Sequence, residues 1–345
     1  MNKRFRAAIV GCGRMGGFID DEMVGRPYFT PPYCHAGAYR AVPEVELVAA
    51  ADIVPEKARA LAERWEVPRW YTDYREMIQR EQPEILSITT RPDTHAEILL
   101  FAAEQGVRAI YCEKPLCTSM EEADAMLRAV QERGIAFNLG VNRRFQEGYR
   151  RMRQLIQEGA IGELQVVSAY SSGSAYWTHS HTVDLLLFLA GDPTVQAAWG
   201  ELNAEPSQWS DREVRTDPGV RWAQFVFANG VRGQMVSTSG YEFEAHGSRG
   251  KLRAYGNGAQ FSWIVYDRQG VPEERAFPAF RRTSGAVECV RNLIAALQLG
   301  EATWAPIESS HRGQEMLHGL LESHRREGAR VAFPLKDRGF RVSAW

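Results

Sequence analysis

The feature that most constrains the fold is a glycine-rich turn that follows an apolar run near the N-terminus. Residues 7–10 read Ala-Ala-Ile-Val and lead directly into residues 11–16, GCGRMG. A G-x-G-x-x-G spacing between a strand and a helix is typical of the first βαβ unit of a dinucleotide-binding domain. In that unit Gly11 permits the tight turn, Gly13 lets the backbone approach a pyrophosphate, and Gly16 lets the helix pack closely on the sheet. The amides at the start of that helix receive the phosphate charge.

A second apolar run supplies an acidic residue that fits this unit. Residues 45–51 predict the next strand, which ends at Asp52. A carboxylate there accepts hydrogen bonds from the ribose hydroxyls of NAD and repels the 2′-phosphate of NADP. The spacing from the glycine turn exceeds the usual value of about 20 residues, because residues 18–34 form an insert. Asp52 could also cap the helix that begins near Pro55, which is compatible with the ribose role. The pattern favours NAD over NADP as cofactor.

The insert has an unusual composition. Its sequence, FIDDEMVGRPYFTPPYC, combines prolines with acidic residues. Three aromatic side chains, Tyr28, Phe29 and Tyr33, lie in its proline-rich part. Because the insert lies beside the predicted cofactor turn, we hypothesise that it covers the site as a lid.

Composition excludes several classes of protein. The chain has 345 residues, 44% hydrophobic and 24% charged, which are ordinary values for a globular protein of two domains. A net charge of -2 gives no electrostatic case for nucleic acid or a membrane as partner. No apolar run approaches the ~20 residues that span a bilayer, and the N-terminal apolar run is too short for a signal peptide. The five cysteines are scattered without metal-ligand spacing, which predicts a reducing, cytoplasmic location and no metal site.

Two rhythms of predicted secondary structure divide the chain. In its first part short apolar runs alternate with helical patterns, as in a doubly wound, mostly parallel sheet. Helical periodicity largely disappears over residues 195–267, where strands dominate and Asn229-Gly230 marks a hairpin turn. We therefore predict an α/β protein. An NAD-binding Rossmann domain spans residues 1–141, and an α+β domain for substrate binding and oligomerisation, with a large, mainly antiparallel open sheet, spans residues 142–345.

Several helices carry clear end signals. Asp73 is a plausible N-cap, and Ser119 with Glu122 forms a capping box. Helices are also predicted over residues 183–189 and 285–299.

A lysine is placed where ligands of α/β sheets bind. Glu113-Lys114-Pro115 follows the strand predicted for residues 107–112, at the carboxyl end of a parallel strand. A partly desolvated lysine there could bond a substrate hydroxyl, with its pKa shifted towards neutrality. Pro115 would fix the backbone, with a cis bond as one option. The alternative is that Glu113 and Lys114 form an ordinary exposed pair.

A second cluster lies in residues 174–192, SAYWTHSHTVDLLLFLAGD. His181 and Asp184 are three residues apart at the start of an apolar helix and share one face. A histidine, with an ordinary pKa of about 6.5, is suited to taking and returning a hydroxyl proton. Asp184 could orient the ring or bind substrate. The alternative is that both residues only begin the helix. Flat surfaces of the kind on which sugar rings stack are offered by Tyr176, Trp177 and His179.

Taken in order, these segments resemble one known family. IVGCGRMG, TTRPDTHAEI, CEKPL, IGELQVV and HTVDLLLFLAG are similar to motifs of the Gfo/Idh/MocA family, NAD(P)-dependent oxidoreductases of sugars, polyols and related carbohydrates. The resemblance extends from about Phe5 to ESHRREGARVAFPL near the end. It implies a Rossmann domain followed by a carbohydrate-binding α+β domain, and a homodimer or homotetramer formed through the second domain's sheet.

The resemblance also implies roles for single residues. Lys114 matches the family lysine that contacts the reacting hydroxyl and the nicotinamide. His181 matches the acid/base histidine, and Asp184 the aspartate that follows it. Arg143 and Arg144 match a position that often lines the substrate cleft. The candidate substrate-binding residues are Asp184, Arg144, Trp177, His179 and Tyr176. The candidate cofactor-binding residues are Gly11, Gly13, Arg14, Met15, Gly16, Asp52, Thr90, Arg91, His95, Glu113 and Lys114.

One position departs from the family pattern. Many family dehydrogenases carry an aspartate four residues before the histidine, where this chain has Trp177. Either His179 or another side chain substitutes for it, or the substrate is positioned by stacking on Trp177.

Three functions remain open at this point. The primary hypothesis is an NAD-dependent oxidoreductase that transfers hydride between nicotinamide and a hydroxyl-bearing carbon of a sugar, polyol or glycoside. An alternative is an NAD-retaining, redox-assisted glycosidase or lyase of the same family. The third is a non-catalytic dinucleotide-binding regulator, which the absent aspartate keeps open although Lys114 and His181 favour an enzyme.

Overall fold

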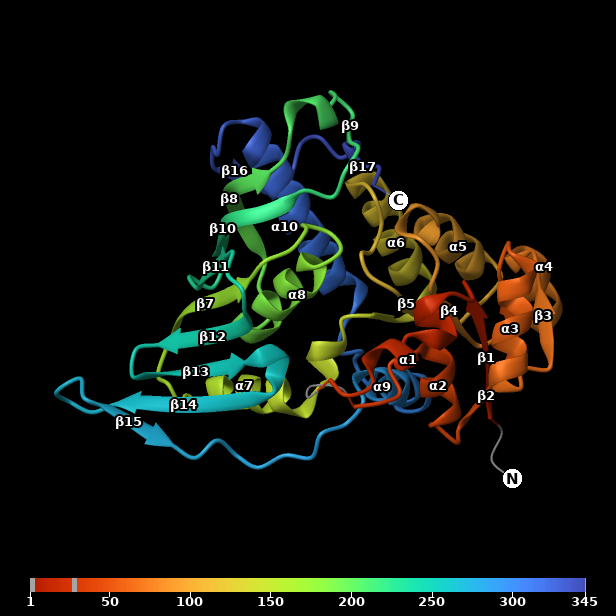
Figure 1. The fold of residues 1–345 in the computed structure, drawn as a ribbon, viewed down its shortest axis with the longest axis horizontal. Coiled ribbons are helices and arrows are strands. Elements are labelled where there is room, and N and C mark those ends of the chain that lie inside the picture. The colour runs from red at the N-terminus through yellow and green to blue at the C-terminus, as the bar shows by residue number, and fades with distance from the viewer. Residues whose placement is uncertain (1–3, 27–29, 345) are drawn as a thin grey trace. The chain divides into compact units, whose positions relative to one another are not determined.

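The computed structural model describes residues 4–26 and 30–344, which form two compact units (Figure 1). The first unit contains Met1–Phe145 and Thr283–His311, and the second contains Gln146–Arg282 and Arg312–Ala344. The chain therefore returns to its first unit after leaving it. The predicted division into residues 1–141 and 142–345 places Thr283–His311 in the second domain, whereas the structure places this segment in the first unit. The functional roles attached to the two predicted ranges stay predictions.

A six-stranded parallel sheet is the centre of the first unit. Its strand order, β3-β2-β1-β4-β5-β6, is that of a doubly wound dinucleotide-binding fold. Because its strands are covered by helices, the central ones are buried along nearly their whole length. The strands are β1 (Phe5–Val10), β2 (Val45–Ala51), β3 (Arg69–Tyr71), β4 (Ile85–Ile88), β5 (Ala109–Cys112) and β6 (Ala136–Leu139).

Helices with well-defined ends connect these strands. The carboxylate of Asp73 accepts the amide of Arg75 as predicted for an N-cap. The hydroxyl of Ser119 accepts the amide of Glu122, whereas the Glu122 carboxylate reaches back to Thr118 rather than to Ser119. The helical segments of this unit are η1 (Arg14–Phe18), α1 (Asp20–Met23), α2 (His35–Arg40), α3 (Pro55–Trp65), α4 (Tyr74–Glu81), α5 (Pro92–Glu104), α6 (Met120–Arg133), η2 (Asn142–Phe145) and α9 (Gly285–Leu299).

The second unit is built on a nine-stranded sheet of order β15-β14-β13-β12-β7-β11-β10-β8-β16. Within this described sheet β7 and β11 pair in parallel, and the other neighbouring strands pair in the antiparallel direction. Its strands are β7 (Leu164–Ser171), β8 (Val195–Asn203), β10 (Gly219–Phe227), β11 (Arg232–Val236), β12 (Tyr241–Gly247), β13 (Gly250–Tyr255), β14 (Gln260–Tyr266), β15 (Pro272–Arg275) and β16 (Val331–Ala332). A two-stranded sheet joins β9 (Glu213–Val214) to β17 (Arg341–Val342).

The two faces of this large sheet differ in chemistry. On one face Tyr149 of α7 (Glu147–Gln157) packs edge-on against Phe243 and Phe261. The helix α8 (His179–Ala190) packs against β7 (Figure 1). On the other face Glu244 lies directly opposite Arg253 in the strand register. We call this second side the open face, defined by Glu242, Glu244, Lys251 and Arg253. A last helix, α10 (Ile307–Arg325), begins in the first unit and continues into the second.

Within the described residues no helix is both long and apolar enough to cross a membrane.

Candidate functional site

The three glycines of the predicted turn meet different surroundings. Gly11 has a φ of +97°, and a β-carbon there would lie 2.7 Å from the carbonyl carbon of Thr89. A β-carbon on Gly16 would lie 2.3 Å from the carbonyl oxygen of Gly11. A β-carbon on Gly13 would meet nothing within 4 Å. The protein's own packing therefore requires glycine at residues 11 and 16, whereas the space at Gly13 is left for a group that approaches the backbone, as a pyrophosphate does.

The carboxylate of Asp52 is bound to this turn. Its Oδ2 accepts the amide of Cys12 at 2.8 Å, and its Oδ1 accepts the amide of Val54, the N-cap residue of α3, at 2.9 Å. Each carboxylate oxygen retains a further lone pair after accepting one amide. Asp52 can therefore hold the end of β2 against the glycine turn and still accept a ribose hydroxyl. The prediction that Asp52 could cap this helix is wrong, because Val54 is the N-cap and Asp52 only accepts its amide, whereas the ribose role stays a prediction.

Acidic residues hold the insert to itself and connect it to the glycine turn. Asp20 Oδ1 accepts the amide of Tyr33 at 2.6 Å and that of Cys34 at 3.2 Å. Arg14, inside the glycine turn, donates to both oxygens of Glu22 at 2.8 and 2.7 Å, but both side chains are exposed, so the pair contributes little to stability. Met15 is half-buried in η1. Tyr28 and Phe29 lie outside the described residues, so the lid hypothesis stays a prediction.

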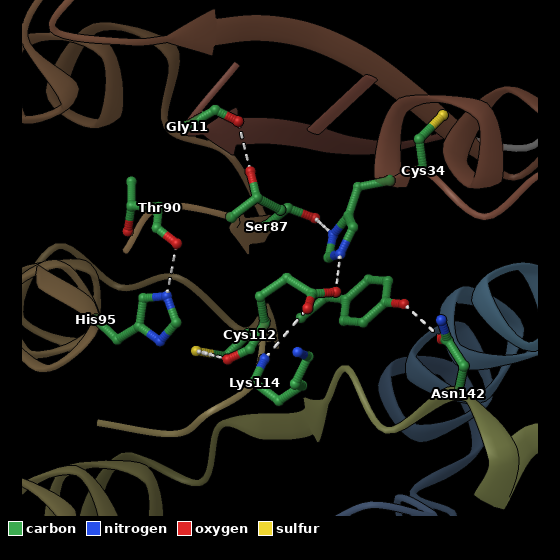
Figure 2. Close-up of polar contacts among 12 residues, drawn as sticks. Gly11, Cys34, Ser87, Thr90, His95, Cys112, Lys114 and Asn142 are labelled. Carbon is green, nitrogen blue, oxygen red and sulfur yellow. Dashed lines mark hydrogen bonds and ion pairs between the residues drawn. The ribbon is translucent and has the colours of Figure 1, made fainter. Parts of the chain in front are cut away.

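The strand β5 delivers Glu113 and Lys114 to the carboxyl edge of the parallel sheet, and the Lys114–Pro115 peptide bond is cis. Lys114 is half-buried, whereas Glu113 is only 3% exposed. Glu113 Oε1 lies 3.0 Å from Nε2 of His35, and its Oε2 accepts the amide of Lys114 at 3.3 Å (Figure 2). The alternative that Glu113 belongs to an ordinary exposed pair is therefore wrong. The carboxylate instead supports the main chain that carries Lys114.

His95 connects two loops at this edge. Its Nδ1 lies 3.1 Å from the carbonyl oxygen of Pro115 and 3.2 Å from that of Leu116. Its Nε2 lies 3.2 Å from the carbonyl oxygen of Thr90, a contact that Figure 2 shows. The ring is fully buried, and burial lowers the pKa of His95. We conclude that His95 holds the loops together, while half-buried Thr90 and exposed Arg91 remain available to a cofactor.

Arg144 also differs from its predicted setting. It lies in η2, at the end of the first unit's opening segment, and not in a second domain. Its side chain is 1% exposed, and Nη1 donates to the carbonyl oxygen of Trp304 at 3.2 Å. This contact holds the returning segment of the first unit.

In the second unit the aromatic candidates separate into buried and exposed residues. Tyr176 is fully buried, and its hydroxyl lies 2.8 Å from Nδ1 of His318. His179 is 1% exposed, with Nδ1 3.1 Å from the hydroxyl of Thr182, and burial lowers its pKa to about 4. The prediction that Tyr176 and His179 offer flat surfaces is therefore wrong, because neither ring is presented to solvent. Trp177 is 51% exposed.

The exposed Trp177 ring stands on a fixed main chain. Asp217 accepts the amide of Tyr176 through Oδ1 and that of Trp177 through Oδ2, each at 2.8 Å. The carboxylate thus holds the segment just before α8 while the indole remains accessible. His181 and Asp184 follow inside α8, the first half-buried and the second buried. The helix begins at His179, earlier than predicted from residues 183–189.

Sequence reasoning missed four side chains that organise these clusters: His35, Tyr39, Ser87 and Asp217. Ser87 had a signal, because it is the single polar residue in the fully buried β4. Asp217 stands in Asp-Pro-Gly, which reads only as a turn. Within the described residues no cluster of three or more histidine, cysteine or acidic side chains could hold a metal ion.

Comparisons with known proteins agree with this geometry. Residues 5–141 match a family model described as an oxidoreductase family with an NAD-binding Rossmann fold. The D-apiose dehydrogenase of Paraburkholderia graminis is 29% identical over 88% of this chain and 87% of its own length. The myo-inositol 2-dehydrogenase of Thermotoga maritima is 22% identical over 86% of this chain and 89% of its own. A solved levoglucosan dehydrogenase, in complex with NADH and levoglucosan, shares the fold with a TM-score of 0.75, 21% identity and coverage of 96% and 100%.

Proposed function

We propose that the chain is a member of the Gfo/Idh/MocA family of oxidoreductases, and that it is an NAD-dependent dehydrogenase or reductase acting on a CH–OH group of a sugar, polyol or glycoside. The observation that carries the proposal is the open space at Gly13, beside a carboxylate that holds the glycine turn. Relatives that match most of this chain are named as dehydrogenases of a sugar and of an inositol, which supports a carbohydrate or polyol substrate.

The residues at the glycine turn fit NAD. We assign the pyrophosphate to the backbone at Gly13 and the adenosine ribose to Asp52, whose charge disfavours a 2′-phosphate. Thr90 and Arg91 belong to the same carboxyl edge of the sheet. When bound, NAD would supply the hydride acceptor or donor.

Two side chains are assigned to the reacting hydroxyl. In the direction of oxidation His181 accepts the hydroxyl proton, and Lys114 donates a hydrogen bond to the oxygen as negative charge develops on it. Asp184, one turn after His181, orients the imidazole or a substrate hydroxyl. Trp177 offers the exposed ring for stacking, in the position where many relatives carry an aspartate.

A panel of sugars and polyols, assayed for NADH and for NADPH formation, tests this function. We expect net NADH formation with at least one compound and a lower kcat/KM with NADP. Product release without net NADH formation would instead indicate the redox-assisted glycosidase or lyase. Binding of NAD without turnover of any compound would indicate the regulator.

We also propose that the open face forms a homodimer or homotetramer. Glu244 is only 8% exposed although it lies on this face, and Lys251 and Arg253 surround its carboxylate. Such half-buried charges of both signs allow a second copy to pair with them across a two-fold axis.

A further inference from the structure

A chain of buried polar side chains leads from the core of the first unit to Glu113. The hydroxyl of Tyr39 lies 2.7 Å from that of Ser87, and the Ser87 hydroxyl lies 2.8 Å from Nδ1 of His35. Nε2 of His35 lies 3.0 Å from Glu113 Oε1 (Figure 2). All four residues are buried, and the His35 ring stacks on Tyr111 with centroids 3.8 Å apart. The chain therefore has fixed geometry and no contact with bulk water.

The placement of hydrogen atoms along this chain follows from its buried end. Burial raises the pKa of Tyr39, so its phenol keeps its proton. Ser87 Oγ is the hydrogen-bond partner that the structure gives to that phenol, and a buried donor without an acceptor is costly. Tyr39 therefore donates to Ser87. The Ser87 proton would be buried without an acceptor unless it is donated to Nδ1 of His35. This leaves the imidazole proton on Nε2, where it is donated to Glu113.

The opposite direction is unfavourable at both ends. If Ser87 donated to Tyr39, the buried phenol proton would have no acceptor. Nδ1 of His35 would then carry the imidazole proton, and Nε2 would present a lone pair to the Glu113 carboxylate. The observed distances are satisfied without such a penalty only when every donor points towards Glu113.

This direction gives Glu113 a defined state. Its carboxylate receives the His35 Nε2–H on one oxygen and the amide of Lys114 on the other. The site is also shaped for the carboxylate, because a β-carbon on Gly140 would lie 2.6 Å from Glu113 Oε1. The Glu113 side chain, held in this way, in turn holds the main chain at Lys114.

We propose that Tyr39, Ser87 and His35 form a one-directional hydrogen-bond chain that fixes the Glu113 carboxyl group in place, and that His35 is thereby a positioning residue for Lys114. The proposal deepens the proposed function and rests on the role assigned there to Lys114. It also gives a reason for a polar residue in β4 and for a histidine at the start of α2.

Nitrogen-15 NMR of histidine-labelled protein tests the direction without any activity measurement. The His35 resonances are assigned by their loss in His35→Asn. We expect a ring proton on Nε2 and a lone pair on Nδ1. A proton on Nδ1, or protons on both nitrogens, would overturn the proposal.

Two variants separate the contact with Glu113 from the loss of the ring. The amide nitrogen of glutamine reaches the position of Nε2, so His35→Gln keeps a donor to Glu113, whereas the shorter His35→Asn reaches only as far as Nδ1. We expect kcat to stay within about threefold in His35→Gln and to fall by about 30-fold in His35→Asn, because misplacement of a reacting group slows the chemical step. KM and the Kd for NADH should change little in both. Equal kcat values in the two variants would contradict a positioning role.

A control and a separate check keep the two proposals distinguishable. His324→Asn alters a half-buried histidine of α10 whose ring contacts Trp209, and it should leave kcat unchanged. If Lys114→Ala retains full turnover, the proposed function is wrong, while the NMR result still decides the direction of the chain. If NMR finds the ring proton on Nδ1 and Lys114→Ala is inactive, the hydrogen-bond chain proposal is wrong while the proposed function stands.

Discussion

Neighbouring glycines in one turn serve different purposes, and substitution can separate them. Gly11 and Gly16 face backbone atoms of the protein, whereas Gly13 faces open space. An alanine at residue 13 has no protein atom to strike, so its methyl group occupies only the volume assigned to the pyrophosphate.

We therefore expect Gly13→Ala to keep the melting temperature of the wild type and to weaken NADH binding at least about tenfold, since the backbone of this turn must approach the pyrophosphate. Gly16→Ala serves as the matched control, because overpacking against Gly11 should cost about 1–3 kcal/mol of unfolding free energy. Thermal denaturation and a fluorescence titration with NADH measure the two effects. A wild-type affinity of Gly13→Ala for NADH would contradict the assignment of the pyrophosphate to this turn.

The two residues assigned to the hydroxyl make a second prediction at this scale. Lys114→Ala and His181→Ala should each lower kcat about 100-fold or more, because a general acid–base group contributes that much, while the Kd for NADH stays near the wild-type value. Lys57→Ala, an exposed lysine of α3, is the control for loss of a lysine. Near-normal kcat in either catalytic variant, measured with an authentic substrate, would contradict that residue's role.

Motifs located the residues that lie next to a strand end, but not their supports. Lys114 and Asp52 could be predicted because each lies within two residues of the end of a recognisable buried strand. His35 could not be linked to Glu113, because 78 residues separate them in sequence and only the packing of α2 brings the ring to β5. The sequence also could not predict which aromatic side chains are exposed. Tyr176 and Trp177 are neighbours of similar type, but Tyr176 is buried in the core and Trp177 is exposed.

At the scale of single elements, α8 makes a prediction about pH. His179 begins this helix, and burial lowers its pKa to about 4. In the unfolded chain a histidine takes up its proton near pH 6.5, so acid favours the unfolded state. The unfolding free energy should therefore fall as pH drops from about 6.5 to about 4, by about 3 kcal/mol from this residue, and buried His95 acts in the same direction.

Urea denaturation of the wild type and of His179→Gln at several pH values measures this contribution. Glutamine has no proton to take up in this range, so the variant should lose less stability on acidification than the wild type. Parallel pH curves for the two proteins would show that His179 is not the group responsible.

Elements with local end signals were predicted well, and elements defined by pairing were not. The helix expected over residues 285–299 matches α9, because Ser284 accepts the amide of Val287 at one end and Gly300 has a φ of +69° at the other. The three-residue β3 was missed, because Arg69–Tyr71 has no buried face and becomes a strand only by pairing with β2. The start of α8 was placed too late, because its first turn lacks the apolar pattern of the rest.

At the scale of the whole molecule, the open face leads to a prediction about the oligomeric state. We expect the wild type to sediment as a dimer or tetramer at micromolar concentration. Arg253→Glu places a third negative charge beside Glu242 and Glu244, so the dissociation constant of the oligomer should rise at least about tenfold. Arg59→Glu, on the exposed side of α3, is the control. A monomeric wild type would contradict the proposed interface.

The overall class of the fold could be predicted, but the path of the chain between units could not. Alternating strands and helices indicate the parallel sheet, and the later strand-rich region indicates the second sheet. The return of Thr283–His311 depends on buried contacts over long sequence distances. Asn138 in β6 donates to Asn292 Oδ1 at 2.9 Å and accepts the amide of Ala305 at 2.9 Å. No local sequence pattern predicts such contacts.

This return limits how the gene can be divided. A fragment ending at residue 145 would lack the returning segment and leave both polar ends of Asn138 without their partners inside an apolar interior. Recombination at a single crossover point would cut the same contacts, so a nucleotide-binding module of this kind can be exchanged between proteins only if two separate stretches of coding sequence travel together.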